Sequence, residues 1–301
     1  MGVSFRGWAV RFRSLKSFLA AACLAPLAVS GPVLAGSAVK VAVSIAPQKY
    51  FVQKVGGRLA EVTVMVPPGA SPATYEPRPR QMAALSEAKV YFALGLPFEK
   101  AWLPKMAAAN RDMTVVHTEA QVERRAMASR TGQGRGGSDS PDPHIWLSPP
   151  LVKIQAAAIR EGLIKADPAH KAVYERNYAA FEAELIALDE EIKALFAGQR
   201  GKVRFLVFHP AWGYFAQAYG LEQIAIEQEG KEPGPRELKR LIGQARELGL
   251  KVIFVQPQFS AQKARTIARS IGGQVVPIDP LAEDWADNLR QAAREIKAGL
   301  K

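Results

Sequence analysis

Histidine is scarce in this sequence, so its positions are the first guide to chemistry. His209 directly follows the strand-like run 203–208, at its carboxyl end. Asp279 follows the run 274–278 in the same way. Imidazole and carboxylate groups bind transition metals, and ligands of open α/β sheets lie beyond the carboxyl ends of strands. The chain has four histidines in total: His117, His144, His170 and His209.

The segment 141–149, Pro-Asp-Pro-His-Ile-Trp-Leu-Ser-Pro, places His144 just before a helix expected to begin near Ser148. A serine at this position is typical of a helix N-cap. His144, His209 and Asp279 could therefore converge on one transition metal ion. Polar residues stand at strand ends in any α/β protein, so purely structural hydrogen bonds are the alternative interpretation.

The elements that position these residues form two similar sets. Short runs rich in β-branched residues alternate with helical stretches, which is typical of parallel sheets covered by helices. The amino-terminal set has expected strands at 40–45, 61–66, 90–94 and 113–116, and helices at 48–59, 80–88 and 98–109. The carboxyl-terminal set has expected strands at 203–208, 223–226, 251–255 and 274–278, and helices at 211–219, 235–248, 261–271 and 284–298. We expect an α/β fold of two lobes, each with a four-stranded parallel sheet.

A single long helix is expected to join the lobes, from about 168 to 196. Apolar residues recur there at alternating spacings of four and three, which places them on one helix face. They are Tyr174, Tyr178, Phe181, Leu185, Leu188, Ile192 and Leu195. Packing against the chain's own lobes is favoured over an intermolecular coiled coil, and a stiff connector predicts little motion between lobes. The expected boundaries are 36–166 for the amino-terminal lobe, 167–198 for the connecting helix and 199–301 for the carboxyl-terminal lobe.

The first 35 residues are typical of an export signal. Four basic residues precede the apolar stretch 18–29, and Val33-Leu34-Ala35 fits a cleavage site before Gly36. A lipid anchor at Cys23 is the alternative, although the lipobox match is loose. Elsewhere the chain has no apolar run long enough to span a bilayer. We therefore expect a periplasmic protein, and cleavage after Ala35 would leave it without cysteine.

The net charge is +12, which by itself could indicate an anionic partner. Part of that excess lies in the signal, and the arginine-containing segment 123–142 has no interleaved aromatic residues. We interpret 123–142 as a mobile surface loop, because it is rich in Gly and Ser and almost free of apolar side chains. Together with export, these features argue against nucleic acid as a partner.

Four motifs stand in order along the chain at 66–77, 142–149, 208–215 and 278–282. Together they closely resemble those of the zinc/manganese solute-binding proteins of ABC transporters, over nearly all of the mature chain. The resemblance implies capture of a divalent metal in the cleft between the lobes and delivery to a membrane permease, without catalysis. Carried over to this sequence, it implies that His144, His209 and Asp279 are metal ligands.

The sequence departs from that family pattern at Ala73. The family motif carries a histidine ligand at this position, whereas the methyl group of alanine coordinates nothing. Glu76 or His117 could supply the missing donor, and water is the other possibility. Zinc members often have a histidine-rich loop before the second motif, but the segment 123–142 contains no histidine.

Two other functions remain open on sequence alone. Three protein ligands and a water are typical of catalytic zinc, which would fit a hydrolase, but no HExxH or GxSxG motif is present. A metal-independent adhesin on the same scaffold is the second alternative. For the binding protein we expect Zn²⁺, with Mn²⁺ or Fe²⁺ acceptable to the same donors, and a monomer.

Overall fold

The computed structural model describes residues 37–127, 141–199, 203–227 and 232–300, together with residues 1, 2 and 201. Residues Ser37–Lys301 form one compact unit. Apart from residues 1 and 2, the expected signal at 1–35 lies outside the described residues, as do residues 128–140 of the segment 123–142. Within the described part, no helix combines the length and the apolar character needed to span a membrane.

The amino-terminal lobe contains a four-stranded parallel sheet in the order β2-β1-β3-β4. Its strands are β1 (Val39–Val43), β2 (Ala60–Val64), β3 (Val90–Ala93) and β4 (Thr114–His117). Its helices are α1 (Ala46–Gly56), α2 (Pro79–Leu85), α3 (Pro97–Ala109) and α4 (Pro149–Ala166). All four expected strands are confirmed. The central strand β3 is buried throughout, as expected for a strand covered on both faces.

The carboxyl-terminal lobe repeats this plan with a parallel sheet in the order β6-β5-β7-β8. Its strands are β5 (Val203–Val207), β6 (Leu221–Ala225), β7 (Val252–Val255) and β8 (Gln274–Pro277). Its helices are α6 (Gly213–Ala218), α7 (Pro235–Glu247), α8 (Ala261–Ser270) and α9 (Trp285–Gly299). The expected fold class of two parallel α/β sheets is confirmed.

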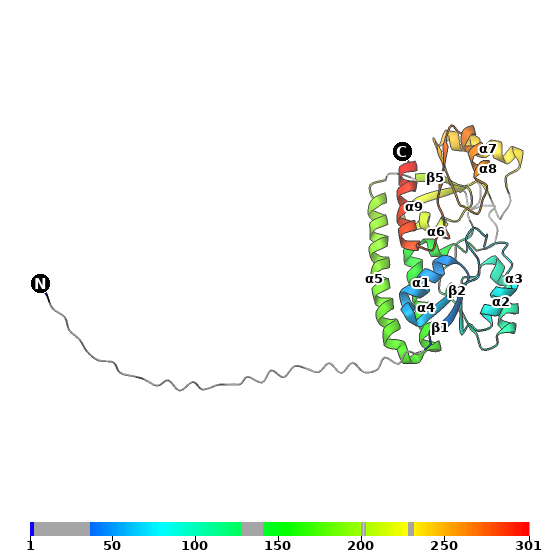
Figure 1. Cartoon of the computed structure of the whole chain (residues 1–301). Coiled ribbons are helices and arrows are strands. Elements are labelled where there is room, and N and C mark those ends of the chain that lie inside the picture. Colours follow the sequence, from blue (N-terminus) through cyan, green and yellow to red (C-terminus); the bar gives the residue numbers. More distant parts are fainter. Residues whose placement is uncertain (3–36, 128–140, 200, 202, 228–231, 301) are drawn as a thin grey trace, which may run out of the picture. The chain divides into compact units, whose positions relative to one another are not determined.

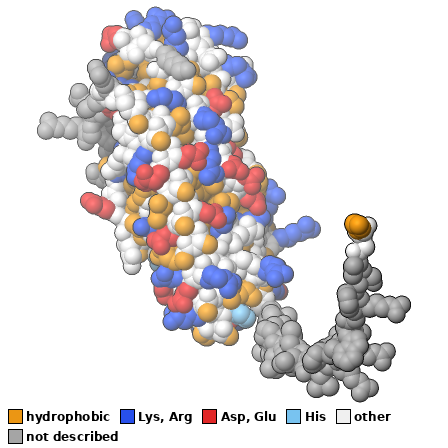
Figure 2. Space-filling view, turned by 90° about the vertical axis from the view of Figure 1, so that its left-hand side faces the viewer, with side chains coloured by type: hydrophobic (Ala, Val, Ile, Leu, Met, Phe, Trp, Pro, Cys, Tyr) orange, Lys and Arg blue, Asp and Glu red, His pale blue; other side chains and the backbone are white. Residues whose placement is uncertain are grey.

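The connecting helix is α5 (Lys171–Phe196), preceded by the short 3-10 turn Pro168–His170. It packs against α1 and α4 of the first lobe and against α9 of the second, so the apolar stripe is covered by the chain itself. Figure 1 shows this helix running alongside both lobes. On the face that carries α5, basic and acidic side chains are interspersed (Figure 2), as the polar side of the helix predicts.

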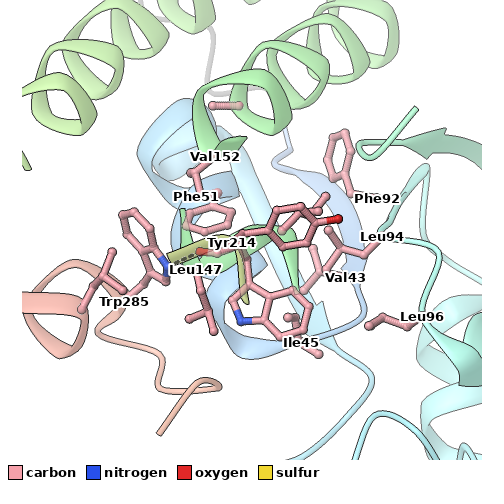
Figure 3. Close-up of a cluster of buried hydrophobic side chains, with 14 of the residues drawn as sticks. Val43, Ile45, Phe51, Phe92, Leu94, Leu96, Leu147, Val152, Tyr214 and Trp285 are labelled. Carbon is pink, nitrogen blue, oxygen red and sulfur yellow. Dashed lines mark hydrogen bonds between the residues drawn. The ribbon is translucent and has the colours of Figure 1, made fainter. Parts of the chain in front are cut away.

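One hydrophobic core extends through both lobes. It packs the sheet of the first lobe against one face of the second sheet, and Trp285 of the second lobe lies beside Phe51 of the first, with ring centroids 5.0 Å apart (Figure 3). The indole of Trp285 donates to the carbonyl oxygen of Trp146 at 2.7 Å, and the indole of Trp146 donates to the carbonyl oxygen of Pro280 at 2.7 Å. This shared core favours a fixed arrangement of the lobes.

Three local features differ from the sequence-based expectation. Ser148 occupies the N-cap position of α4, but its side chain makes no capping hydrogen bond. A 3-10 turn, Ile145–Leu147, precedes it and was not expected. Helix α6 is shorter than the expected 211–219, because residues 209–212 form a turn that leads out of β5.

Candidate metal centre

His209 lies just beyond the carboxyl end of β5. Phe208 continues the sheet by donating its N–H to the carbonyl oxygen of Phe254 at 2.8 Å, and the chain then turns away. The Gln256 side chain clamps the backbone of His209, donating to its carbonyl oxygen at 2.9 Å and accepting from its N–H at 3.3 Å. The sheet edge thus fixes the position from which this imidazole projects.

His144 comes from outside the sheet of the amino-terminal lobe. It stands at the start of the 3-10 turn Ile145–Leu147, where it is buried. Asp142 accepts from the backbone N–H of His144 at 3.0 Å, and the Tyr214 hydroxyl donates to the carbonyl oxygen of Asp142 at 3.0 Å. The backbone N–H of Arg125 in turn donates to the Tyr214 hydroxyl at 3.1 Å. Both ends of the segment 123–142 are therefore held by hydrogen bonds, while 128–140 lie outside the described residues.

The two imidazoles face each other through their Nε2 atoms, which are 3.3 Å apart. Each Nδ1 atom faces a buried carboxylate: His144 lies 2.7 Å from Asp142 Oδ1, and His209 forms a short hydrogen bond with Glu227. A carboxylate only accepts, so each Nδ1 is the donor of its pair, and a ring in its neutral form would direct an Nε2 lone pair at the other ring. A cation between the two Nε2 atoms, either a proton or a metal ion, would satisfy both lone pairs.

The surroundings of His209 disfavour the proton. Burial lowers the pKa of His209, and the nearby His144 lowers it further, whereas Glu227 acts in the opposite direction. Phe259 stacks on the His209 ring with centroids 5.0 Å apart, and Trp146 lies 5.1 Å from the His144 ring. These apolar contacts and the lowered pKa favour the neutral form of His209, which is the form that binds metals.

The imidazoles open into a cavity of about 470 Å³ between the lobes. The loop containing Ala73 lines the cavity together with residues 95–97, so the departure from the family motif lies at this site. From the other lobe, Gln256, Gln258 and Phe259 contribute to the wall.

Asp279 lies beside the cavity, which is lined by the next two residues, Pro280 and Leu281. Its Oδ1 accepts from the Leu281 N–H at 2.9 Å and from the Gln258 side chain at 3.3 Å. Among the described residues there is no group of three or more His, Cys, Asp or Glu side chains close enough to hold a metal ion. The structure thus brings two of the three expected ligands together, with the third engaged in its own loop.

The remaining candidates lie apart from this pair. His117 ends β4, is exposed, and places Nδ1 3.0 Å from Glu119 Oε1. Glu76 is exposed, and neither it nor His117 lines the cavity. His170 lies just before the connecting helix, where its Nδ1 is hydrogen-bonded to Asp167 Oδ2 at 2.7 Å. None of these three residues is placed to replace the histidine missing at Ala73.

The match to known proteins is extensive. A family model described as the periplasmic component A of a zinc-uptake complex, ZnuA, matches residues 41–299. The chain belongs to this ZnuA family. The resemblance inferred from the four motifs is thereby confirmed.

Solved structures agree in fold as well as in sequence. A crystal structure of ZnuA is 44% identical, with a TM-score of 0.82 over 88% of this chain and 100% of that one. A zinc-bound deletion mutant of ZnuA is also 44% identical, with a TM-score of 0.81 over 87% and 98% of the two chains. The high-affinity zinc uptake protein ZnuA of Bacillus subtilis is 26% identical over 92% of this chain and 89% of its own length.

Membership of the ZnuA family decides between the functional classes. The chain is the solute-binding component of a zinc-uptake ABC transporter, and it is not an enzyme, so the hydrolase alternative is dropped. The laminin-binding protein of Streptococcus agalactiae, described as having both adhesin and metal-transporting activity, shares the fold. It is 27% identical, with a TM-score of 0.77 over 88% of this chain and 100% of that one.

Sequence reasoning missed two residues of this centre, Asp142 and Glu227. Glu227 could have been noticed as a polar residue at the end of the expected strand 223–226, although only the structure shows that this strand is the neighbour of the one that His209 follows. Asp142 is fully buried, which differs from the mobile surface loop that the composition of 123–142 predicts. Its position two residues before His144 was the available signal.

Proposed function

We propose that this chain captures one zinc ion between the Nε2 atoms of His144 and His209 and delivers it to a membrane permease. The supporting observation is the 3.3 Å separation of these atoms, with both Nδ1 atoms turned to carboxylates. Zinc binds imidazole nitrogen at about 2.0–2.1 Å. Two such nitrogens on a tetrahedral ion lie roughly 3.3–3.4 Å apart, so the pair needs little rearrangement to bind zinc.

Asp279 supplies the third ligand in this proposal. Its loop borders the cavity, and the hydrogen bonds that its carboxylate accepts within the described part of the chain, from Leu281 and Gln258, go to Oδ1. In this proposal the carboxylate gives up its 3.3 Å contact with Gln258 and binds the metal instead. Two imidazoles and one carboxylate are a common donor set for zinc, and they accept Mn²⁺ or Fe²⁺ less readily in a tetrahedral geometry.

The buried carboxylates behind the histidines support the same assignment. Asp142 and Glu227 fix the tautomer and the orientation of the two rings, and a carboxylate at Nδ1 makes Nε2 a stronger metal donor. Because one histidine comes from each lobe, the bound ion would link the two lobes at the cavity between them.

We further propose that the signal is cleaved after Ala35, and that the mature protein works in the periplasm as a monomer without a lipid anchor at Cys23. The apolar stretch 18–29 and the small residues before Gly36 carry this part of the proposal. Zinc and the permease are its partners; nucleic acid is not.

Zinc titration of the untagged mature protein, monitored by competition with a chromogenic chelator, tests the proposal. We expect one equivalent of zinc to bind, with weaker binding of Mn²⁺ and Fe²⁺ under the same conditions. Replacing both His117 and His170 by alanine provides the matched control and should leave the titration unchanged. The assignment would be refuted if the unmodified protein bound no zinc, or if the control variant lost zinc binding.

A further inference from the structure

The cavity beside the two imidazoles is much larger than a metal ion requires. Its volume of about 470 Å³ lies within the range of roughly 300–1,000 Å³ typical of small-molecule sites. One water molecule takes up only about 30 Å³ in the liquid. An ion with a single bound water would therefore leave most of this space unused.

The donors of the proposed zinc site also leave one coordination position open. A tetrahedral zinc ion takes four ligands, of which His144, His209 and Asp279 provide three. Ala73 stands on the cavity wall, and its methyl group offers no donor. The open position therefore faces the cavity and is accessible to a donor from a molecule in it.

Lys100 is a charged side chain on the cavity wall that could receive such a molecule. Among the described residues that line the cavity, Lys100 is the only Lys, Arg, Asp or Glu. It is exposed, in the first turns of α3, and forms no ion pair within the described part of the chain. Much of the remaining lining is apolar, including Leu96, Phe259 and Leu281. A small anion with a metal-binding group fits this combination of one cation and apolar walls.

We propose that zinc is bound here as a chelate with a small carboxylate, an amino acid or a hydroxy acid, whose carboxylate pairs with Lys100. A donor atom of that molecule completes the zinc coordination where Ala73 replaces histidine. When the protein takes up the zinc complex, one ligand set is substituted for another. The two imidazoles and Asp279 displace water, or the donors of a second chelator molecule, from the zinc ion. One chelator molecule stays bound to it. This inference rests on the proposed function, because the two histidines must hold the ion.

Equilibrium dialysis with radioactive zinc and radiolabelled L-histidine or citrate, one chelator in each arm, tests the inference. We expect at least one of the chelators to be retained at one equivalent per protein when zinc is present, and neither without zinc. Lys100→Ala should weaken chelator retention about two- to fivefold, the effect of losing one exposed ion pair. Zinc retention in chelator-free buffer should be the same in this variant as in the unmodified protein.

Lys105→Ala is the matched control, because Lys105 lies on the same helix, contacts Trp102 and does not line the cavity. It should retain chelator normally. Ala73→His should reduce chelator retention, because the new imidazole occupies the open position. If zinc is retained at one equivalent while both chelators stay at their metal-free level, the inference is overturned and the proposed function stands. If zinc itself is not retained in either buffer, the proposed function fails.

Discussion

Strands β1 and β5 occupy the same place in their sheets, which have the orders β2-β1-β3-β4 and β6-β5-β7-β8. Beyond β5, the chain presents His209 to the cavity. Beyond β1, it presents Ser44, which is buried and hydrogen-bonded to the Tyr91 hydroxyl at 2.9 Å. The same topology therefore supplies a metal donor in one lobe and an internal hydrogen-bond network in the other.

The network of the amino-terminal lobe holds the cavity wall in place. Glu99 is buried beside Ser44 and accepts hydrogen bonds from the backbone N–H groups of Leu94, Gly95 and Leu96, at 2.6–3.1 Å. Burial raises the pKa of the Glu99 carboxyl, and its hydrogen bonds with the Ser44 hydroxyl and the backbone N–H groups of Leu94 and Leu96 oppose the increase. Gly95 and Leu96 line the cavity, so this sheet edge shapes the site without contributing a ligand.

Each lobe nevertheless contributes one histidine whose imidazole is paired with a buried carboxylate. In the carboxyl-terminal lobe, Glu227 at the end of the neighbouring strand holds His209. In the amino-terminal lobe, Asp142 from the same loop holds His144 at 2.7 Å. Both lobes therefore pair an imidazole with a carboxylate. The pair lies at the sheet edge in the carboxyl-terminal lobe and in a loop outside the sheet in the amino-terminal lobe.

The largest expected effect is the loss of either histidine. His209→Ala and His144→Ala should each weaken zinc binding by at least about a hundredfold, more than the loss of an outer partner of a ligand causes. Chelator competition measures the affinity, and circular dichroism checks that the fold is kept. Equal losses would mean that both lobes contribute one ligand each. Unchanged affinity in either variant would show that the replaced histidine is not a zinc ligand.

Replacing the carboxylates tests whether their roles are equivalent in the two lobes. Glu227→Gln and Asp142→Asn should each weaken zinc binding about tenfold to a hundredfold, because the ring is then held less firmly and its Nε2 is a weaker donor. Glu119→Gln, which changes a carboxylate beside the exposed His117, serves as the control. Isothermal titration at one pH and ionic strength gives the three affinities. An effect confined to one lobe would show that the other histidine is positioned by its backbone alone.

Adding a ligand to the amino-terminal lobe should strengthen binding. Ala73→His places an imidazole on the cavity wall and should tighten zinc binding at least about tenfold. The gain should disappear in the Ala73→His, His144→Ala double variant, since both rings would then no longer share one ion. Isothermal titration in chelator-free buffer measures the difference. No gain with the fold preserved would mean that the open position lies elsewhere.

The smallest expected effect is that of mild acidification. Protons compete with zinc for Nε2, and the pKa of His209 is lowered by burial, so the ring stays neutral below the ordinary value of about 6.5. Zinc affinity should therefore change by less than about threefold between pH 7.5 and 6.5, and fall steeply only at lower pH. Competition titrations across this range provide the measurement. A constant affinity down to pH 5 would argue against histidine ligands.

Much of this architecture could be predicted from the sequence, because β-branched runs and the apolar stripe of α5 mark elements that are buried. The places of His209 and Asp279 beyond the carboxyl ends of strands could be predicted as well. The partnership of His209 with Glu227 could not, because it depends on which strands are neighbours. The approach of His144 to His209 depends on how the lobes pack, and no local periodicity encodes that.

The most direct test of the central claim is NMR of the untagged mature protein labelled with ¹⁵N-histidine. The chain has only four histidines, so each imidazole can be followed separately. With one equivalent of zinc, we expect the Nε2 resonances of His144 and His209 to shift while both rings keep their Nδ1 protons. Those of His117 and His170 should not move. Zinc-dependent shifts at Nδ1, at only one of the two facing rings, or at His117 would contradict the account.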